Sequence, residues 1–181
     1  MANQAFPALA RCDVEGRVLK LADGSCATVR ALRAHETAIV AEVFAGMSER
    51  SRRDRFGGPK PQLSLAELEH LAAVDHRNHE ALVAVESDTG RAVAIARFVR
   101  DRFDEHVAEV AFAVVDGWQG RRLGTRLAEL LACRAREEGI ERLRAFVLAE
   151  NRNSRALVRR LGRLVDHSFD GDSAELVVAL A

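Results

Sequence analysis

Hydrophobic and polar positions along this chain follow two periods, and the period changes several times between the two ends. Short segments rich in β-branched and apolar residues are bounded by turn signals such as Asp23-Gly24 and the stretch 87–90. This pattern is typical of β-strands joined by tight turns. We expect strands at 18–21, 27–32, 81–86, 92–99, 107–115, 143–148, 164–169 and 174–180.

Other segments carry apolar residues three and four positions apart, which indicates helices. In the clearest one, four leucines between positions 123 and 131 form a single stripe, and Gly139 follows as a C-cap would. Ser64 and Glu67 have the spacing of a capping box at the start of another. We expect helices at about 35–45, 48–56, 64–74, 122–138 and 154–161, the last stopped by Gly162.

The order of these elements predicts a mixed α/β protein with a largely antiparallel sheet. A length of 181 residues suits one domain, which we place at 17–181 behind an N-terminal extension at 1–16. The net charge of zero argues against a nucleic-acid or membrane-surface partner. No apolar run is long enough to cross a bilayer and the start does not look like a signal peptide, so we expect a cytoplasmic protein.

The chain has three cysteines, Cys12, Cys26 and Cys133. They are odd in number, far apart in the sequence, and never arranged as CxxC. This pattern predicts reduced thiols rather than a disulfide framework or a zinc site.

The stretch between Asp116 and Gly124, read as DGWQGRRLG, joins an expected strand to an expected helix. Unpaired N–H groups and a partial positive charge make a helix N-terminus suitable for a phosphate, and glycines let the backbone approach one closely. The sequence is neither a dinucleotide-binding GxGxxG nor a P-loop. On these grounds alone, a phosphate site and an ordinary surface turn are both open.

Two ordered segments resemble the acyl-CoA signature of the GNAT acetyltransferase superfamily. The first is FAVVDGWQGRRLGT at 112–125, and the second is NRNSRALVRRLG at 151–162. The run AEVAFAVVDGWQG is further similar to bacterial protein-lysine acetyltransferases of the Pat type, as are the DG…R spacing at 23–30 and SERSRRDRF at 48–56. The resemblance covers the chain from about residue 27 to the C-terminus.

The resemblance implies a GNAT fold, with a largely antiparallel sheet of six to seven strands splayed between the fourth and fifth and flanked by about four helices. It also implies acetyl-CoA as the cosubstrate, and no metal ion. Backbone amides would hold the pyrophosphate, and pantetheine would lie between the splayed strands like an added strand. The implied acetyl-CoA-binding residues are Phe112, Ala113, Val114, Gln119, Gly120, Arg121, Arg122, Leu123, Gly124, Thr125, Asn151 and Ser154.

Two positions depart from the family pattern. Arg122 stands where the phosphate loop usually has glycine, and a positive φ there would cost about 1 kcal/mol or more. Val158 stands where many relatives have a tyrosine that protonates the departing thiolate, and the chain contains no tyrosine at all. We therefore expect water, a cysteine or no group to serve as the acid. Asn151 fits a helix cap as well as a pantetheine contact.

Glu109 is the candidate general base. It interrupts an otherwise apolar strand, and alternation places it on one face with the small residues Ala111 and Ala113. The residue pattern equally fits a solvated face or a salt bridge with Arg97; the resemblance implies the catalytic role.

The resemblance implies transfer to a primary amine, on a lysine of a protein such as an acyl-CoA synthetase. The sequence leaves open a small amine or amino acid as acceptor, a non-catalytic acyl-CoA sensor, and a monomer or a homodimer. Two weaker features remain. His70, His76 and His79 read as solvated or capping residues rather than metal ligands, and the arginine-rich stretch 50–55 as a solvated face that could rim an acceptor groove.

Overall fold

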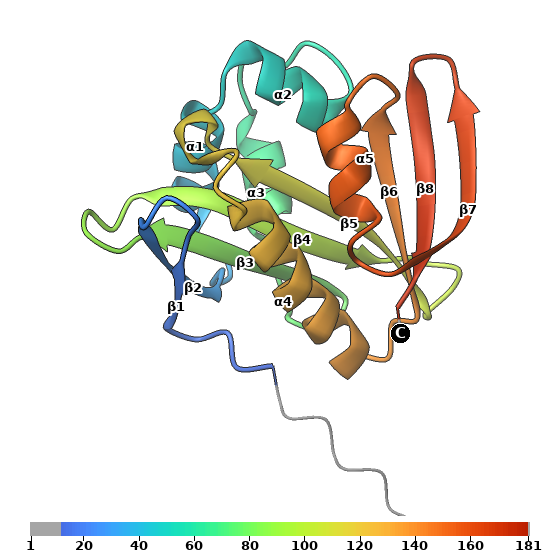
Figure 1. Cartoon of the computed structure of the whole chain (residues 1–181), viewed down its shortest axis with the longest axis horizontal. Coiled ribbons are helices and arrows are strands. Elements are labelled where there is room, and N and C mark those ends of the chain that lie inside the picture. The colour runs from blue at the N-terminus through green and yellow to red at the C-terminus, as the bar shows by residue number, and fades with distance from the viewer. Residues whose placement is uncertain (1–11, 181) are drawn as a thin grey trace, which may run out of the picture.

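A twisted sheet of eight strands organises the chain (Figure 1). The computed structural model describes residues 12–180. Along the sheet the strands run in the order β1-β2-β3-β4-β5-β6-β8-β7, and every neighbouring pair is antiparallel except β5 and β6. The bounds are β1 Arg17–Lys20, β2 Cys26–Ala31, β3 His79–Glu86, β4 Ala92–Arg100, β5 Val107–Val114, β6 Arg142–Leu148, β7 Arg163–Asp170 and β8 Ser173–Ala179.

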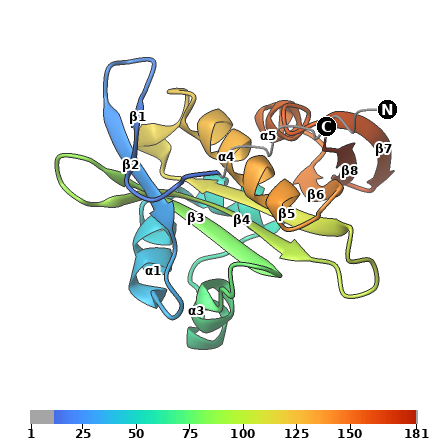
Figure 2. The same ribbon diagram turned by 90° about the horizontal axis from the view of Figure 1, so that it is seen from below.

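Helices cover both faces of this sheet (Figure 2). Helices α4 and α5 lie on one face, and α1 and α3 lie on the other. A short 3₁₀ helix, η1 (Asp116–Trp118), precedes α4. The α-helices are α1 Thr37–Ala45, α2 Glu49–Phe56, α3 Leu65–Ala72, α4 Leu123–Glu137 and α5 Arg152–Val158.

The predicted mixed α/β class and the largely antiparallel sheet are confirmed. Within residues 12–180 the structure has the eight strands and five α-helices that the hydrophobic pattern predicted, whereas the resemblance implied six to seven strands and about four helices. The N-terminal hairpin of β1 and β2 accounts for the shift in strand numbering, so the splay lies between the fifth and sixth strands rather than the fourth and fifth. No helix within residues 12–180 is long and apolar enough to cross a membrane.

Local sequence signals begin α3 and bound α2 as expected, whereas α5 spans Arg152–Val158 instead of the expected 154–161. The capping box of α3 forms, because Ser64 accepts from the backbone of Glu67 while the Glu67 carboxylate accepts from the backbone N–H of Ser64. Helix α2 begins at the Ser48 cap and ends at Gly57, which adopts the left-handed conformation that glycine favours.

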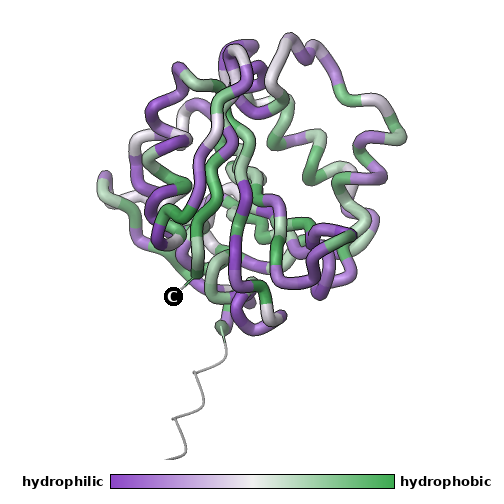
Figure 3. The backbone as a smooth tube through the Cα atoms, turned by 90° about the vertical axis from the view of Figure 1, so that its right-hand side faces the viewer, coloured by the Kyte–Doolittle hydropathy of each residue, from purple (hydrophilic) through white to green (hydrophobic). Residues whose placement is uncertain are grey.

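Apolar side chains fill two separate layers, one on each face of the sheet. Against α4, the core includes Phe98, Leu127 and Leu131, all fully buried. Against α1 and α3, a smaller core includes Val43 and Val83. The strands between the two layers are therefore buried on both sides. Figure 3 colours the backbone by hydropathy and shows hydrophobic and hydrophilic residues alternating along the strands.

The prediction of reduced cysteines is wrong for one pair. Cys12 and Cys133 are joined in a disulfide, with Cα atoms 6.0 Å apart and a separation of 121 positions in the sequence. Only Cys26 is a free thiol within the described residues. Sequence spacing gave no sign of this pair, because the fold alone brings the segment before β1 onto α4.

The expected N-terminal extension falls partly outside the described residues, which begin at Cys12. Within residues 12–16, Val14 is buried in the larger core, and the Glu15 carboxylate accepts a hydrogen bond from the backbone N–H of Ala31 at 3.0 Å. This part of the segment packs against the domain.

Candidate active site

The two parallel strands β5 and β6 separate along their length. They pair only at Val107–Glu109 against Arg142–Arg144. Beyond Glu109, β5 keeps its register with β4 as far as Val114 but has no partner on its β6 side. The sheet is therefore open at its centre, as the family resemblance implied, and the opening lies between its fifth and sixth strands.

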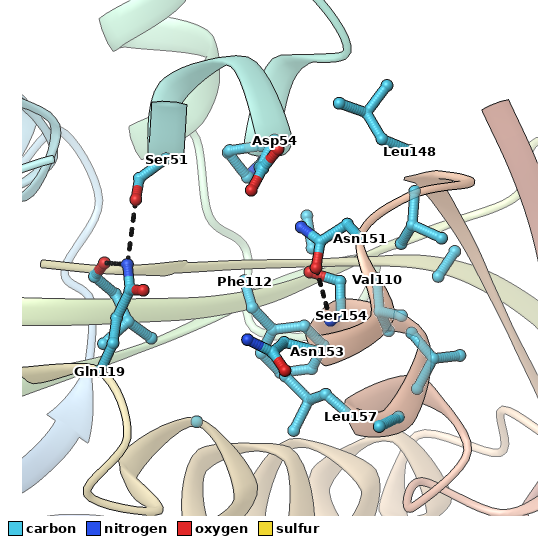
Figure 4. A pocket seen from close by; sticks show the side chains of 18 of the residues that line it. Ser51, Asp54, Val110, Phe112, Gln119, Leu148, Asn151, Asn153, Ser154 and Leu157 are labelled. Atoms are coloured by element: carbon cyan, nitrogen blue, oxygen red, sulfur yellow. Dashed lines mark hydrogen bonds between the residues drawn. The ribbon is translucent and has the colours of Figure 1, made fainter. Parts of the chain in front are cut away.

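A cavity of about 670 Å³ occupies this opening (Figure 4). Helix α2, the turn before α4, helix α5 and both diverging strands line it. Figure 4 shows Ser51 and Asp54 on α2 lying across the cavity from Asn151 and Ser154. One space thus joins these five elements, which are far apart along the chain.

The backbone of β5 decides which of its amides face the opening. The Val115 N–H donates to the carbonyl of Val93, next to β4, at 2.9 Å. Because backbone groups point to alternate sides along a strand, the amides of Phe112 and Val114 face the gap and that of Ala113 faces β4. Free amides on this edge can pair with an extended ligand.

The turn before α4 has the backbone shape of an anion site. Gly120 has φ of +74° and Arg122 has φ of +67°, and Arg122 directly precedes the first turn of α4. Left-handed residues in such a turn bring neighbouring N–H groups toward one point, and the helix N-terminus adds its partial positive charge. Gln119 fixes the turn, since its side-chain amide donates to the carbonyl of Val114 and to Ser51, both at 3.0 Å.

Arg122 has the positive φ for which we expected a conformational strain, and its side chain makes no hydrogen bond that caps α4. We expect Arg122→Gly to raise the free energy of unfolding by up to about 1 kcal/mol, because glycine adopts this conformation without strain. Urea unfolding of the variant and the parent measures it. Gly117→Ala, at a glycine with open space around it and no positive φ, is the matched control. An unchanged or lower stability in R122G would contradict the assignment of strain.

Most of the residues predicted to bind acetyl-CoA line the cavity. They are Phe112, Val114, Gln119, Gly120, Arg122, Leu123, Gly124, Thr125, Asn151 and Ser154.

Two predicted residues lie elsewhere. The Arg121 guanidinium pairs with Asp23 at 2.9 Å and lies over the ring of buried Trp118, so its side chain joins the turn to the β1–β2 hairpin instead of reaching the cavity. Ala113 lies on the opposite face of β5, where it lines a second, smaller cavity. Alternation along β5 explains this second difference.

Asn151 combines the two roles that the sequence left open. Its side-chain oxygen caps α5 by accepting from the backbone N–H of Ser154 at 2.9 Å, and both residues line the cavity. Val158, at the position of the missing tyrosine, is 2% exposed and packs in the larger core. No hydroxyl group is offered from that position.

Glu109 lines the same cavity from the other face of β5, beside Ala111. Its side chain is exposed to the cavity rather than desolvated, and it makes no ion pair with any residue from 12 to 180. The alternative of a salt bridge to Arg97 is therefore not realised, although the two side chains interact electrostatically. The carboxylate is therefore accessible from the opening of the sheet.

Helix α2 contributes more to the cavity wall than the sequence indicated. Met47, Ser51, Asp54, Arg55 and Phe56 all line the cavity, so the arginine-rich stretch forms part of its wall rather than only a solvated face. The apolar residues at its two ends were a signal, because a fully solvated helix needs none.

The three histidines His70, His76 and His79 lie on or next to α3 and β3. His79 is buried and its Nδ1 lies 2.8 Å from the carbonyl oxygen of Ala73, and its ring lies 6.4 Å from that of His70. His76 pairs with the buried carboxylate of Glu80 at 2.9 Å. These contacts stabilise the fold around β3.

A sheet opened between two parallel strands, with an anion-binding turn at the mouth of the opening, defines the class: an acyltransferase of the GNAT fold. The chain belongs to the Acetyltransferase (GNAT) family, whose sequence profile matches residues 47–162.

Individual relatives agree with this assignment. The chain is 41% identical over 103 residues to Acetyltransferase Pat of Mycolicibacterium smegmatis, a match that spans 57% of this chain and 30% of that protein. It is 30% identical over 166 residues to Acetyltransferase PA5475 of Pseudomonas aeruginosa, across 91% of this chain and 88% of that one. The crystal structure of the GNAT domain of S. lividans PAT superposes with a TM-score of 0.81 at 28% identity, covering 91% of this chain and 96% of that domain. The predicted resemblance to Pat-type enzymes is confirmed.

Proposed function

We propose that this protein transfers an acetyl group from acetyl-CoA to a primary amine, and that the amine is a lysine side chain of a protein. The observation that carries the proposal is one cavity that connects the anion-binding turn, the free edge of β5 and Glu109. Family membership and the Pat-type relatives support the same reaction.

In this proposal the pyrophosphate of acetyl-CoA binds the amides of the turn between Gly120 and Thr125. The pantetheine arm pairs with the edge of β5 near Phe112 and Val114, with Asn151 and Ser154 on its other side. The thioester then lies in the opening of the sheet, where the acceptor reaches it from the side of Glu109 and α2.

Chemistry begins when the Glu109 carboxylate, directly or through one water, takes a proton from the acceptor ammonium. The neutral amine attacks the thioester carbonyl carbon, and a backbone amide of β5 near Val114 that faces the opening and is not used by the pantetheine arm stabilises the oxyanion that forms. The C–S bond then breaks as the nitrogen of the adduct gives up its second proton to water, and the CoA thiolate takes a proton from water; the products are the N-acetyl amide and CoA. A thiolate leaves readily, so the reaction does not need the tyrosine absent at position 158.

A protein lysine is the favoured acceptor because its amine sits on a long flexible stem that can enter a cavity from a protein surface. An acyl-CoA synthetase is a reasonable first substrate to test. A small amine or amino acid is the second candidate, favoured by two arginines near Glu109, Arg55 and Arg97, that are described below.

The test is to incubate the protein with acetyl-CoA and a whole-cell protein extract, and to search for new acetyl-lysines by mass spectrometry. Thiol release with a panel of amines and amino acids runs in parallel. New acetyl-lysines support the proposal, and release with small amines alone moves the acceptor to that class. Tight acetyl-CoA binding with no transfer to any acceptor would overturn the proposal in favour of a sensor.

A further inference from the structure

Arg97 lies in the middle of β4, a strand whose neighbours are almost entirely apolar. It is 7% exposed, and its Nη1 atom has no hydrogen-bond partner within the part of the chain that the structure describes. Buried charged groups in proteins are nearly always paired, because desolvation of an unpaired charge costs more than the fold usually tolerates. An unsatisfied buried guanidinium is therefore a binding group for an anion.

A second guanidinium faces the same place. Arg55, on α2, lies close enough to Arg97 for the two charges to repel. Burial, and then the charge of Arg55, lower the pKa of Arg97 to about 10, and burial lowers the pKa of Arg55 as well. The Glu109 carboxylate is the charge that opposes these effects at both residues.

The balance of charge around the pair is positive. Two guanidiniums face one carboxylate, and neither arginine forms an ion pair with any residue from 12 to 180. His79 lies on β3, the strand that neighbours β4. Burial, and then the charge of Arg97, lower the pKa of His79 to about 4, so this imidazole is neutral at pH 7. One anionic charge would complete the cluster.

Space for such an anion exists beside the arginines. Both line a second cavity of about 40 Å³, walled by apolar side chains that include Phe44, Leu71 and Ile95. This volume holds a group the size of a carboxylate, but not a whole amino acid. Apolar walls exclude water and so strengthen a charge-assisted hydrogen bond.

The small cavity adjoins the active-site cavity. Arg55, Phe56, Met47 and Ala111 line both, and Ala111 is two residues from Glu109 on the same face of β5. An acceptor that presents its amine to Glu109 can therefore reach the arginine pair with another part of the same molecule.

We propose that Arg55 and Arg97 form a specificity subsite that binds a carboxylate of the acceptor, close to the amine that is acetylated. This inference rests on the proposed function and narrows its acceptor. The carboxylate has two possible sources: an acidic side chain next to the target lysine in a protein, or the carboxylate of a free amino acid. The chemistry at the two arginines is the same in both.

Steady-state kinetics with charged and neutral acceptor pairs tests the inference and separates the two sources. One pair is a lysine peptide with a neighbouring glutamate and the same peptide with glutamine. The other is a set of free amino acids and their amides. For the source that is used, we expect the neutral form to raise KM at least tenfold with kcat changed little, because a charge-assisted hydrogen bond is lost in binding.

The arginine variants show whether that preference comes from the subsite. In Arg97→Gln and in Arg55→Gln, the KM ratio of neutral to charged acceptor should fall from tenfold or more to about two or less, while KM for acetyl-CoA is unchanged. Arg102→Gln, on the exposed β4–β5 turn and away from both cavities, is the matched control and should keep the full ratio. Arg55 is only half-buried, so Arg55→Gln remains informative even where the substitution of buried Arg97 disturbs folding.

A wild-type protein without preference for either charged acceptor would overturn the inference, as would a preference that survives in both arginine variants. Binding without turnover separates this result from failure of the proposed function. In the presence of CoA, calorimetry compares the N-acetylated charged products with their amides. If the protein binds the charged products more tightly than their amides but transfers no acetyl group, the subsite is supported and the proposed function is wrong. If it transfers acetyl groups without this difference in binding, the proposed function is supported and the subsite is wrong.

Discussion

Glu109→Gln should lower kcat by about 10²- to 10⁴-fold, the usual contribution of general base catalysis, while the Kd for acetyl-CoA changes less than about twofold. The substituted amide keeps the size of the side chain but cannot accept a proton. Binding is spared because the anion-binding turn and the edge of β5, rather than Glu109, are expected to hold the cofactor. Thiol release under saturating acetyl-CoA and acceptor measures kcat, and calorimetry measures Kd.

The control for this substitution is Glu105→Gln. Glu105 lies on the exposed turn before β5, with its side chain 81% exposed, and contacts neither cavity. It should retain the parent kcat. If Glu109→Gln also retains kcat, another group or bulk water removes the proton and the assignment of the base is wrong.

Gly162→Ala should destabilise the fold by about 3 kcal/mol, at the upper end of what overpacking usually costs. A Cβ atom at this position would lie 2.1 Å from the carbonyl oxygen of Ala179, and this neighbour is backbone in β8 that cannot rotate away. For a domain of this size the loss corresponds to a fall in Tm of about 6–12 °C. Thermal unfolding followed by circular dichroism is the measurement.

Gly58→Ala provides the comparison, because a Cβ there would meet nothing within 4 Å and the residue has no positive φ. Its Tm should stay within about 2 °C of the parent. A Gly162→Ala protein as stable as the control would show that β7 and β8 can separate at this point without loss.

Gly162 also shows the difference between a local sequence signal and a tertiary contact. We expected Gly162 to stop a helix that reaches residue 161, but the structure ends α5 earlier, at Val158. Glycine is needed at position 162 because the chain passes within van der Waals contact of β8 there, and not because it stops the helix. No pattern within the segment 154–164 could reveal a neighbour that arrives from residue 179.

The same limit explains the other differences. The disulfide between Cys12 and Cys133 and the turning of Arg121 toward Asp23 both depend on contacts between distant segments. The local features, by contrast, were predictable. The capping box at Ser64, the leucine stripe of α4 and the strand alternation around Glu109 each arise from residues within a few positions of one another.

The sequence by itself determined the order of strands and helices, the fold class, and the two segments that carry the family resemblance. These depend on hydrophobic period and local hydrogen bonding, which act over short distances along the chain. Only the tertiary structure decided where along β5 and β6 the two strands diverge, that Arg122 takes a left-handed conformation, and that Arg55 and Arg97 line one small cavity near Glu109. The charge and the free volume at a site depend on which distant segments the sheet brings together, and these contacts form only when the chain folds.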